Sequence, residues 1–277
     1  MDRLSGGRIF FILLTGTLFF TAYLPAFEIL VEKWQNSEEY SHAFLTLPLL
    51  VYMVWRKKDE LAETTPRFCG AGLLLILLST VSYLFSLLTQ VPTFISLSLY
   101  FTLAGLLIFL GGIQAVRLLF TPLVLLLILI PVPEQLYIKV TFPLQLKVSQ
   151  VSELLLELSG VPILREGNVM HAPGKSFEVV EACSGMRSII TLFTLSLIMG
   201  YFMLKTRVAK ILLLMSSIPI AIAVNIVRVS SMILLYHFFQ LDLSEGFLHT
   251  ATGLLVFALA FAMLLLVHRV LEYGEMR

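Results

Sequence analysis

Long apolar runs separated by short polar segments fill most of the chain. Eight of these runs are long enough, or nearly so, to cross a membrane, which takes about 20 helical residues. The predicted spans are residues 9–27, 41–55, 70–89, 93–111, 116–132, 185–204, 211–236 and 247–268. The pattern therefore predicts an all-α polytopic membrane protein, and we expect residues 1–277 to form a single transmembrane domain.

The longest stretch without a predicted span is residues 133–183. In its first part Leu144, Val148, Val151, Leu155 and Leu158 recur at helical spacing, with polar residues between them. This predicts an amphipathic helix that lies in the membrane interface. Turn-forming residues follow at Gly167-Asn168 and at Pro173-Gly174, with short β-prone runs between and after them. They predict a small β-hairpin that leads to Cys183.

Composition agrees with a membrane protein, since 58% of residues are hydrophobic and only 13% are charged. A soluble domain is about 45–50% apolar and about 25% charged. Twelve Lys and Arg residues fall in the loops on one side and five on the other. Because the positive loops face the cytoplasm, we expect both termini there and residues 133–183 outside. No basic patch with aromatic residues indicates nucleic-acid binding.

Cys183 is the candidate nucleophile, because it directly precedes a long predicted helix. The dipole and free backbone N–H groups of a helix N-terminus favour a thiolate and can bind an oxyanion. A cysteine in a membrane helix is otherwise a small apolar residue. Cys69 is predicted at the opposite membrane face, so no disulfide is expected.

Two arginines lie within predicted spans, where a charge is costly and suggests a function. Arg228 follows Lys210 by 18 residues, or about 27 Å of helix, and so belongs near the outer face. Its alternative role is a structural ion pair with Glu181. Arg187, four residues after Cys183, either supports the thiolate or extends toward water.

His249 is the candidate proton shuttle. It opens the last span, 20 residues before Arg269, which also puts it near the outer face. A cysteine, a histidine and a cation from three spans form a set suited to acyl transfer. The sequence offers no metal-binding spacing and no phosphate loop, so no cofactor is expected. The other histidines follow, with His268 predicted on the cytoplasmic side: His42, His171, His237 and His268.

Four segments resemble the exosortase/archaeosortase family of membrane enzymes. They are Glu181–Ser188 around Cys183, Asn225–Arg228, His249 with Gly253, and Tyr40–Leu45. The resemblance implies a cysteine protease or transpeptidase of the bacterial inner membrane. Its substrates would be exported proteins with a C-terminal PEP-CTERM signal, made of a Pro-Glu-Pro motif, a membrane helix and a basic tail.

The resemblance also implies roles for residues. Cys183 would be the nucleophile, Arg228 the cation that stabilises the oxyanion, and His249 the proton donor. His249 is typical of the bacterial branch, since archaeal relatives have Arg in its place. Supporting positions are expected at Arg187, Asn225, Glu181 and His42. Partners would be the substrate proteins and the lipid bilayer, and the acceptor, water or an amine, stays open.

Two other functions remain possible from the sequence alone. A transporter would use Arg187 and Arg228 as ligands for an anion, although such sites usually lie at the membrane midplane. A non-enzymatic assembly factor for envelope or exopolysaccharide export would need neither a reactive thiol nor a proton shuttle.

Overall fold

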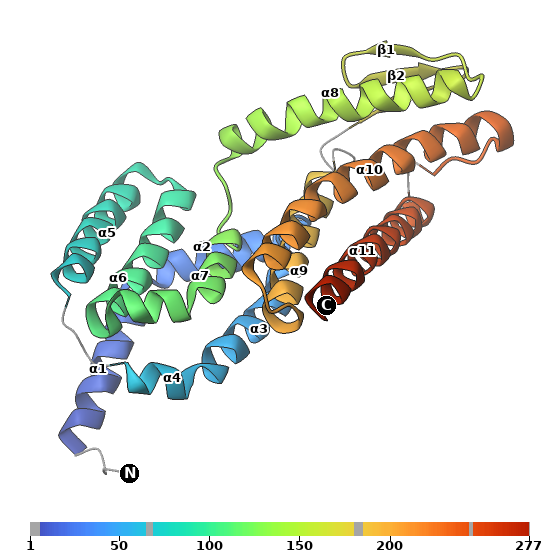
Figure 1. Ribbon diagram of the computed structural model, residues 1–277. Coiled ribbons are helices and arrows are strands. Elements are labelled where there is room, and N and C mark those ends of the chain that lie inside the picture. Colours follow the sequence, from blue (N-terminus) through green and yellow to red (C-terminus); the bar gives the residue numbers. More distant parts are fainter. Residues whose placement is uncertain (1–5, 65–68, 180–184, 244–245, 277) are drawn as a thin grey trace. The chain divides into compact units, whose positions relative to one another are not determined.

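The computed structural model describes residues 6–64, 69–179, 185–243 and 246–276 (Figure 1). The chain divides into two compact units, one from Met1 to Pro133 and the other from Glu134 to Arg277. Nearly all described elements are helices, and one three-stranded sheet occurs in the second unit.

In the first unit, all the regular elements among its described residues are helices. Its elements are α1 (Gly6–Ala22), α2 (Leu24–Asn36), α3 (Ala43–Arg56), α4 (Lys58–Glu63), α5 (Gly70–Thr89), α6 (Pro92–Leu118) and α7 (Phe120–Ile128). Buried hydroxyls connect them, because the hydroxyl groups of Tyr23 and Thr102 lie 2.6 Å apart and those of Thr102 and Ser79 lie 2.8 Å apart. Each hydroxyl therefore has a partner away from water.

Close packing of α5 on α6 depends on a glycine. A Cβ built on Gly72 would lie 2.3 Å from the backbone nitrogen of Phe109 and 2.7 Å from the carbonyl oxygen of Gly105. The two backbones are too close for any side chain at this position, as is common where membrane helices pack through small residues.

The second unit combines a helix, a sheet and three long helices. The elements are α8 (Glu134–Leu158), β1 (Leu164–Glu166), β2 (Val169–Ala172), β3 (Lys175–Glu178), α9 (Met186–Met203), α10 (Arg207–Phe239) and α11 (Gly246–Met276). The strands are antiparallel in the order β1-β2-β3. Strands β2 and β3 form the predicted hairpin around Pro173-Gly174, and β1 adds a third strand that was not predicted.

Among the described residues, five helices are long and apolar enough to cross a membrane: α5, α6, α9, α10 and α11. A sixth span results if α1 and α2 count as one, since they meet at a bend of 60°. The chain is therefore a multi-pass membrane protein, but the predicted number of eight spans is not confirmed.

The two shortest predicted spans account for the difference. Helix α3 has 14 residues, and α7 has only nine, or about 14 Å against a hydrocarbon core of about 30 Å. The prediction of one helix over residues 116–132 is wrong, because residues up to Leu118 still belong to α6. Helix α6 is itself kinked at Gly112, whose φ of +65° only glycine adopts readily.

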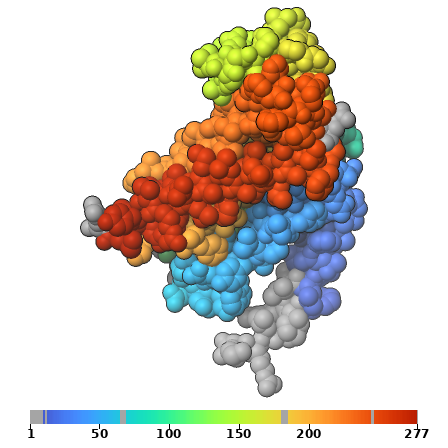
Figure 2. Space-filling model, turned by 90° about the vertical axis from the view of Figure 1, so that its right-hand side faces the viewer, coloured from blue at the N-terminus to red at the C-terminus, as the bar shows by residue number. Residues whose placement is uncertain are grey.

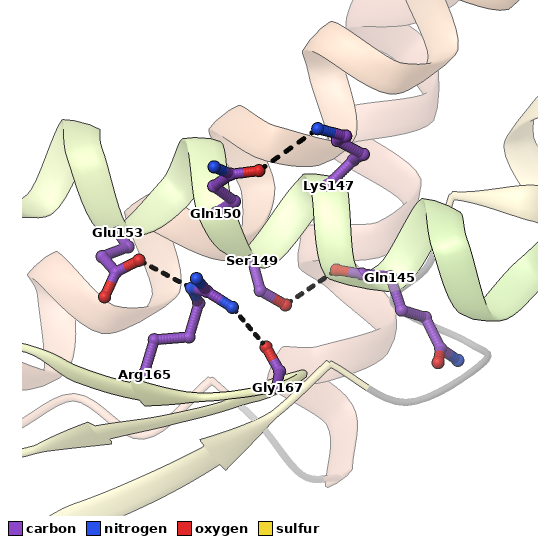
Figure 3. A network of polar contacts seen from close by, with 7 residues as sticks. All are labelled: Gln145, Lys147, Ser149, Gln150, Glu153, Arg165 and Gly167. Atoms are coloured by element: carbon purple, nitrogen blue, oxygen red, sulfur yellow. Dashed lines mark hydrogen bonds and ion pairs between the residues drawn. The ribbon is translucent and has the colours of Figure 1, made fainter.

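Helix α8 buries part of its polar face and exposes part of its apolar face. Gln145, Ser149 and Ser152 are buried, whereas Leu155 and Leu158 are exposed. The Ser149 hydroxyl donates to the Gln145 carbonyl of its own helix at 2.7 Å, so a small side chain can pack there with its polar group satisfied (Figure 3). The exposed leucines are consistent with the predicted position in the membrane interface.

We expect Gly72→Ala to destabilise the protein by about 1–3 kcal/mol, because the added methyl group overpacks the contact between two backbones. Gly70→Ala is the matched control on the same helix, since no described atom lies within 4 Å of its Cβ position. Thermal unfolding of the purified variants in detergent measures the effect. Equal midpoints for the two variants would contradict the close α5–α6 packing.

Candidate functional site

The candidate site lies at one end of the group formed by α9, α10 and α11. Helices α10 and α11 lie side by side, as both views of the molecule show (Figures 1 and 2). At the opposite end, the carboxylate of Glu275 accepts hydrogen bonds from the backbone N–H groups of Lys205 at 3.0 Å and Thr206 at 2.7 Å. This contact joins the end of α11 to the start of α10 and fixes how the two helices align along their length.

Arg228 of α10 and His249 of α11 meet directly. The Arg228 Nη2 atom lies 3.1 Å from the His249 Nε2 atom, and both side chains are partly buried. A guanidinium group can only donate, so Nε2 must be the acceptor and a neutral ring has its proton on Nδ1. The contact therefore defines the tautomer of the neutral His249 ring.

The Arg228 guanidinium rests against the backbone of α11 at Gly253. A Cβ built on Gly253 would lie 3.5 Å from Arg228 Nη2 and 3.8 Å from Arg228 Cζ, which is ordinary van der Waals contact. Gly253 is one helical turn after His249, on the same face of α11. The Arg228 Nε atom is buried and has no hydrogen-bond partner among the described residues. Its N–H group can therefore donate a hydrogen bond to a bound substrate.

Asn225 links α10 to the start of α9. It precedes Arg228 by one helical turn and is 2% exposed. A Cβ built on Gly185 would lie 3.2 Å from the Cβ, Cγ and Nδ2 atoms of Asn225. Gly185 also has a φ of +85°, in the left-handed region that favours glycine. Both the space and the backbone conformation therefore require glycine at this position.

Arg187 lies in the first turn of α9 and is partly buried. It is near enough to Arg228 and His249 for electrostatic interaction with both. The site thus gathers two cations and a histidine in a largely apolar group of helices, which makes it strongly favourable for negative charge.

Not every predicted site residue belongs to this group. Cys183 and Glu181 lie outside the described residues. His42 belongs to the first unit, where it caps α3, and its Nδ1–H donates to the Glu39 carbonyl at 2.9 Å. Burial lowers the pKa of His42 below its usual 6.5, so its ring is neutral at pH 7. Its observed contacts are those of a turn.

The arrangement suits charge stabilisation combined with proton transfer. Arg228 supplies fixed N–H donors, and His249 can take a proton as the neutral ring and give it up again as the imidazolium. Within the described ranges, no three His, Cys, Asp or Glu residues are grouped in a way that would hold a metal ion. The Arg228 donors and the His249 ring together fit acyl transfer by a nucleophile close to this end of the helices.

Sequence reasoning missed the roles of Gly185 and Gly253. A Cβ at Gly185, the N-cap residue of α9, would crowd Asn225, and Gly253 of α11 lies next to the Arg228 guanidinium group. A signal for them existed, since Gly185 follows Cys183 by two residues and Gly253 follows His249 by one helical turn. Only the helix packing shows what these glycines contact.

A family model described as transmembrane exosortase matches residues 34–266. The match covers most of the chain and includes Arg187, Asn225, Arg228 and His249. No curated protein and no solved structure matches the chain.

We expect Gly185→Ala to destabilise the protein more than Gly160→Ala does. Both glycines have positive φ, 85° and 79°, so each substitution carries a backbone cost of about 1–2 kcal/mol. Only Gly185 has a described neighbour close to its Cβ position. Thermal unfolding in detergent compares the two, and equal losses would argue against the contact with Asn225.

Proposed function

Because the chain belongs to the transmembrane exosortase family, we propose that it is a membrane-embedded cysteine protease or transpeptidase. Its substrates are exported proteins that end in a PEP-CTERM signal, with a Pro-Glu-Pro motif, a membrane helix and a basic tail. Cys183 cleaves a backbone peptide bond of this signal at the outer face of the inner membrane.

The contact between Arg228 and His249 is the main support for this proposal. Two polar side chains from separate apolar helices meet at 3.1 Å, and the same face of α10 contacts Gly185 through Asn225. Cys183 precedes Gly185 by two residues, and two residues of chain reach at most about 7 Å. Covalent geometry thus limits how far the nucleophile can be from Gly185.

In the proposed reaction neutral His249 takes the thiol proton of Cys183 and becomes an imidazolium. The resulting thiolate attacks the carbonyl carbon of the scissile peptide bond. The N–H groups of Arg228 stabilise the oxyanion that forms. The C–N bond then breaks, and the leaving amine takes a proton from the His249 imidazolium, which returns to its neutral form. The acyl group remains on Cys183 as a thioester until water or an amine attacks it, with His249 taking up the proton of the attacking group.

The positively charged end of α10 and α11 supports the proposed orientation. Lys205, Arg207, Lys210 and Arg269 lie toward the end at which Glu275 binds the backbone of Thr206. Positively charged loops remain in the cytoplasm, so this end faces inward and the site faces the periplasm. The orientation agrees with a substrate that has already crossed the membrane.

We expect Cys183→Ala to abolish processing and Cys69→Ser to leave it nearly unchanged. Cys69 caps α5 in the first unit and has no place in the proposed mechanism. The measurement is the conversion of a reporter protein ending in a PEP-CTERM signal, at matched amounts of enzyme in the membrane. Continued conversion by Cys183→Ala would exclude the thioester mechanism.

We expect Arg228→Lys to slow processing by about 100- to 1,000-fold, the usual effect of losing an oxyanion donor. Lysine keeps the charge but lacks the planar group that can bind His249 and an oxyanion together. Arg269→Lys is the control, since its side chain is 77% exposed. If Arg228 only balances Glu181, then Arg228→Lys stays active, and Glu181→Gln with Arg228→Gln regains much of the activity.

A further inference from the structure

Strand β3 has one edge that the sheet leaves open. The Val179 N–H donates to the Asn168 carbonyl at 2.9 Å, which fixes the phase of the β2–β3 ladder. Hydrogen-bonded and non-hydrogen-bonded pairs alternate along an antiparallel ladder, so Phe177 bonds to β2. The backbone groups of Ser176 and Glu178 therefore point away from β2. No backbone hydrogen bond from another described residue reaches them.

The other edge strand of the sheet, β1, is bonded to helix α8. Arg165 of β1 donates from Nε to a Glu153 carboxylate oxygen of α8 at 2.6 Å, and from Nη1 to the Gly167 carbonyl at 3.0 Å (Figure 3). Helix α8 lies beside β1 and β2, whereas β3 packs through Phe177 on Tyr236 of α10. Of the two edges, β3 is the better candidate for pairing with another chain.

The side chains along β3 favour an acidic residue at this edge. Phe177 faces the protein interior and is 8% exposed, while Ser176 and Glu178 on either side are exposed. The Lys175 ammonium lies 5.5 Å from the centre of the Phe177 ring, and it forms an ion pair with Asp242. A residue of an added strand aligned with Phe177 would place its side chain beside this ammonium group.

We propose that β3 receives an extended segment of the protein substrate as a fourth, parallel strand, with an acidic residue aligned with Phe177. In a parallel pair this residue donates its N–H to the Ser176 carbonyl and accepts from the Glu178 N–H. The inference rests on the proposed function, in which the substrate is a membrane-anchored protein. It adds the surface that recognises the substrate.

The direction of the added strand follows from how both segments continue. Strand β3 leads within eight residues to α9, which enters the membrane at the end where the site lies. The proposed signal likewise has its acidic motif just before its own membrane helix. Two extended segments that lead into the membrane from the same side run in the same direction, so the added strand is parallel to β3.

Hydrogen-bond alternation makes the same edge tolerant of proline. The backbone groups of Ser176 and Glu178 that point away from β2 bond to a single residue of the added strand. In the added strand, the backbone N–H groups of the residues just before and just after that residue point away from β3. Proline lacks an N–H and is accepted in strands only where that group would face outward. A Pro-Glu-Pro segment has an acidic residue to bond to β3 and a proline on each side, where no N–H toward β3 is needed.

Site-specific photocrosslinking tests the docking separately from the chemistry. A photoreactive residue replaces Glu178 in the full-length Cys183→Ala protein, in membranes that contain a reporter ending in Pro-Glu-Pro, an apolar helix and an arginine cluster. The control position is Glu166 on β1, whose side chain is 72% exposed. We expect crosslinks from position 178 and few from 166.

The outcomes separate this inference from the proposed function. If the unaltered protein processes the reporter but position 178 gives no crosslink, or no more than position 166, the inference is wrong and the proposed function stands. If the unaltered protein fails to process the reporter, the proposed function fails, whatever the crosslinks show.

Backbone pairing is tested by two substitutions at one position. Glu178→Pro removes the outward N–H without removing a bond to β2, and Glu178→Ala removes only the side chain. We expect Glu178→Pro to raise KM by about 3- to 10-fold with little change in kcat, as for the loss of one hydrogen bond. Glu178→Ala should stay close to the unaltered protein. Equal KM values for the two variants would exclude the pairing.

The role of Lys175 is tested together with the substrate, which also covers the case in which Glu178→Pro does not fold. Lys175→Gln should raise KM for a Pro-Glu-Pro reporter but not for a Pro-Gln-Pro reporter, because only the former has the carboxylate. Asp242→Asn breaks the ion pair while keeping Lys175, and should leave KM unchanged or lower. If Asp242→Asn raises KM as much as Lys175→Gln does, Lys175 only anchors the loop and the proposal is wrong.

Discussion

Arg228 carries a permanent charge in the apolar stretch of α10 that follows Lys210, and the candidate site is arranged around that charge. An isolated charge in such a position is costly, so the guanidinium group needs polar neighbours. It donates to Nε2 of His249 at 3.1 Å and lies against the backbone at Gly253. Holding the charge in this way also fixes the tautomer and the orientation of the neutral His249 ring.

Two glycines lie next to the side chains of α10 that form the candidate site. Gly185 and Gly253 place no side chain between their own helices and the face of α10 that carries Asn225 and Arg228. Van der Waals packing and interhelical hydrogen bonds hold membrane helices together, since lipid tails supply no hydrophobic drive for association. Small residues at these positions therefore serve both the packing and the polar site.

The part of the second unit outside the long helices is held by different forces. Helix α8, the sheet and α10 share an apolar core that includes Val148, Met170, Phe177 and Ile233. The ion pair of Lys175 with Asp242 fastens β3 to the segment between α10 and α11. Substrate recognition at β3, as proposed here, would thus lie on the same segment of chain that continues to Cys183 and α9.

The sequence by itself determined the membrane class, the five membrane-length apolar helices α5, α6, α9, α10 and α11, and the β2–β3 hairpin. Long apolar runs and turn residues are local signals, which need no knowledge of neighbours. It also singled out Arg228 and His249, because helical rise per residue and the distribution of charge place both near one membrane face. Only the tertiary structure decided that these side chains touch, that α7 is short, and that α8 buries its small polar residues. Each of these depends on which helix packs against which face, and the spacing of residues along one chain does not contain that information.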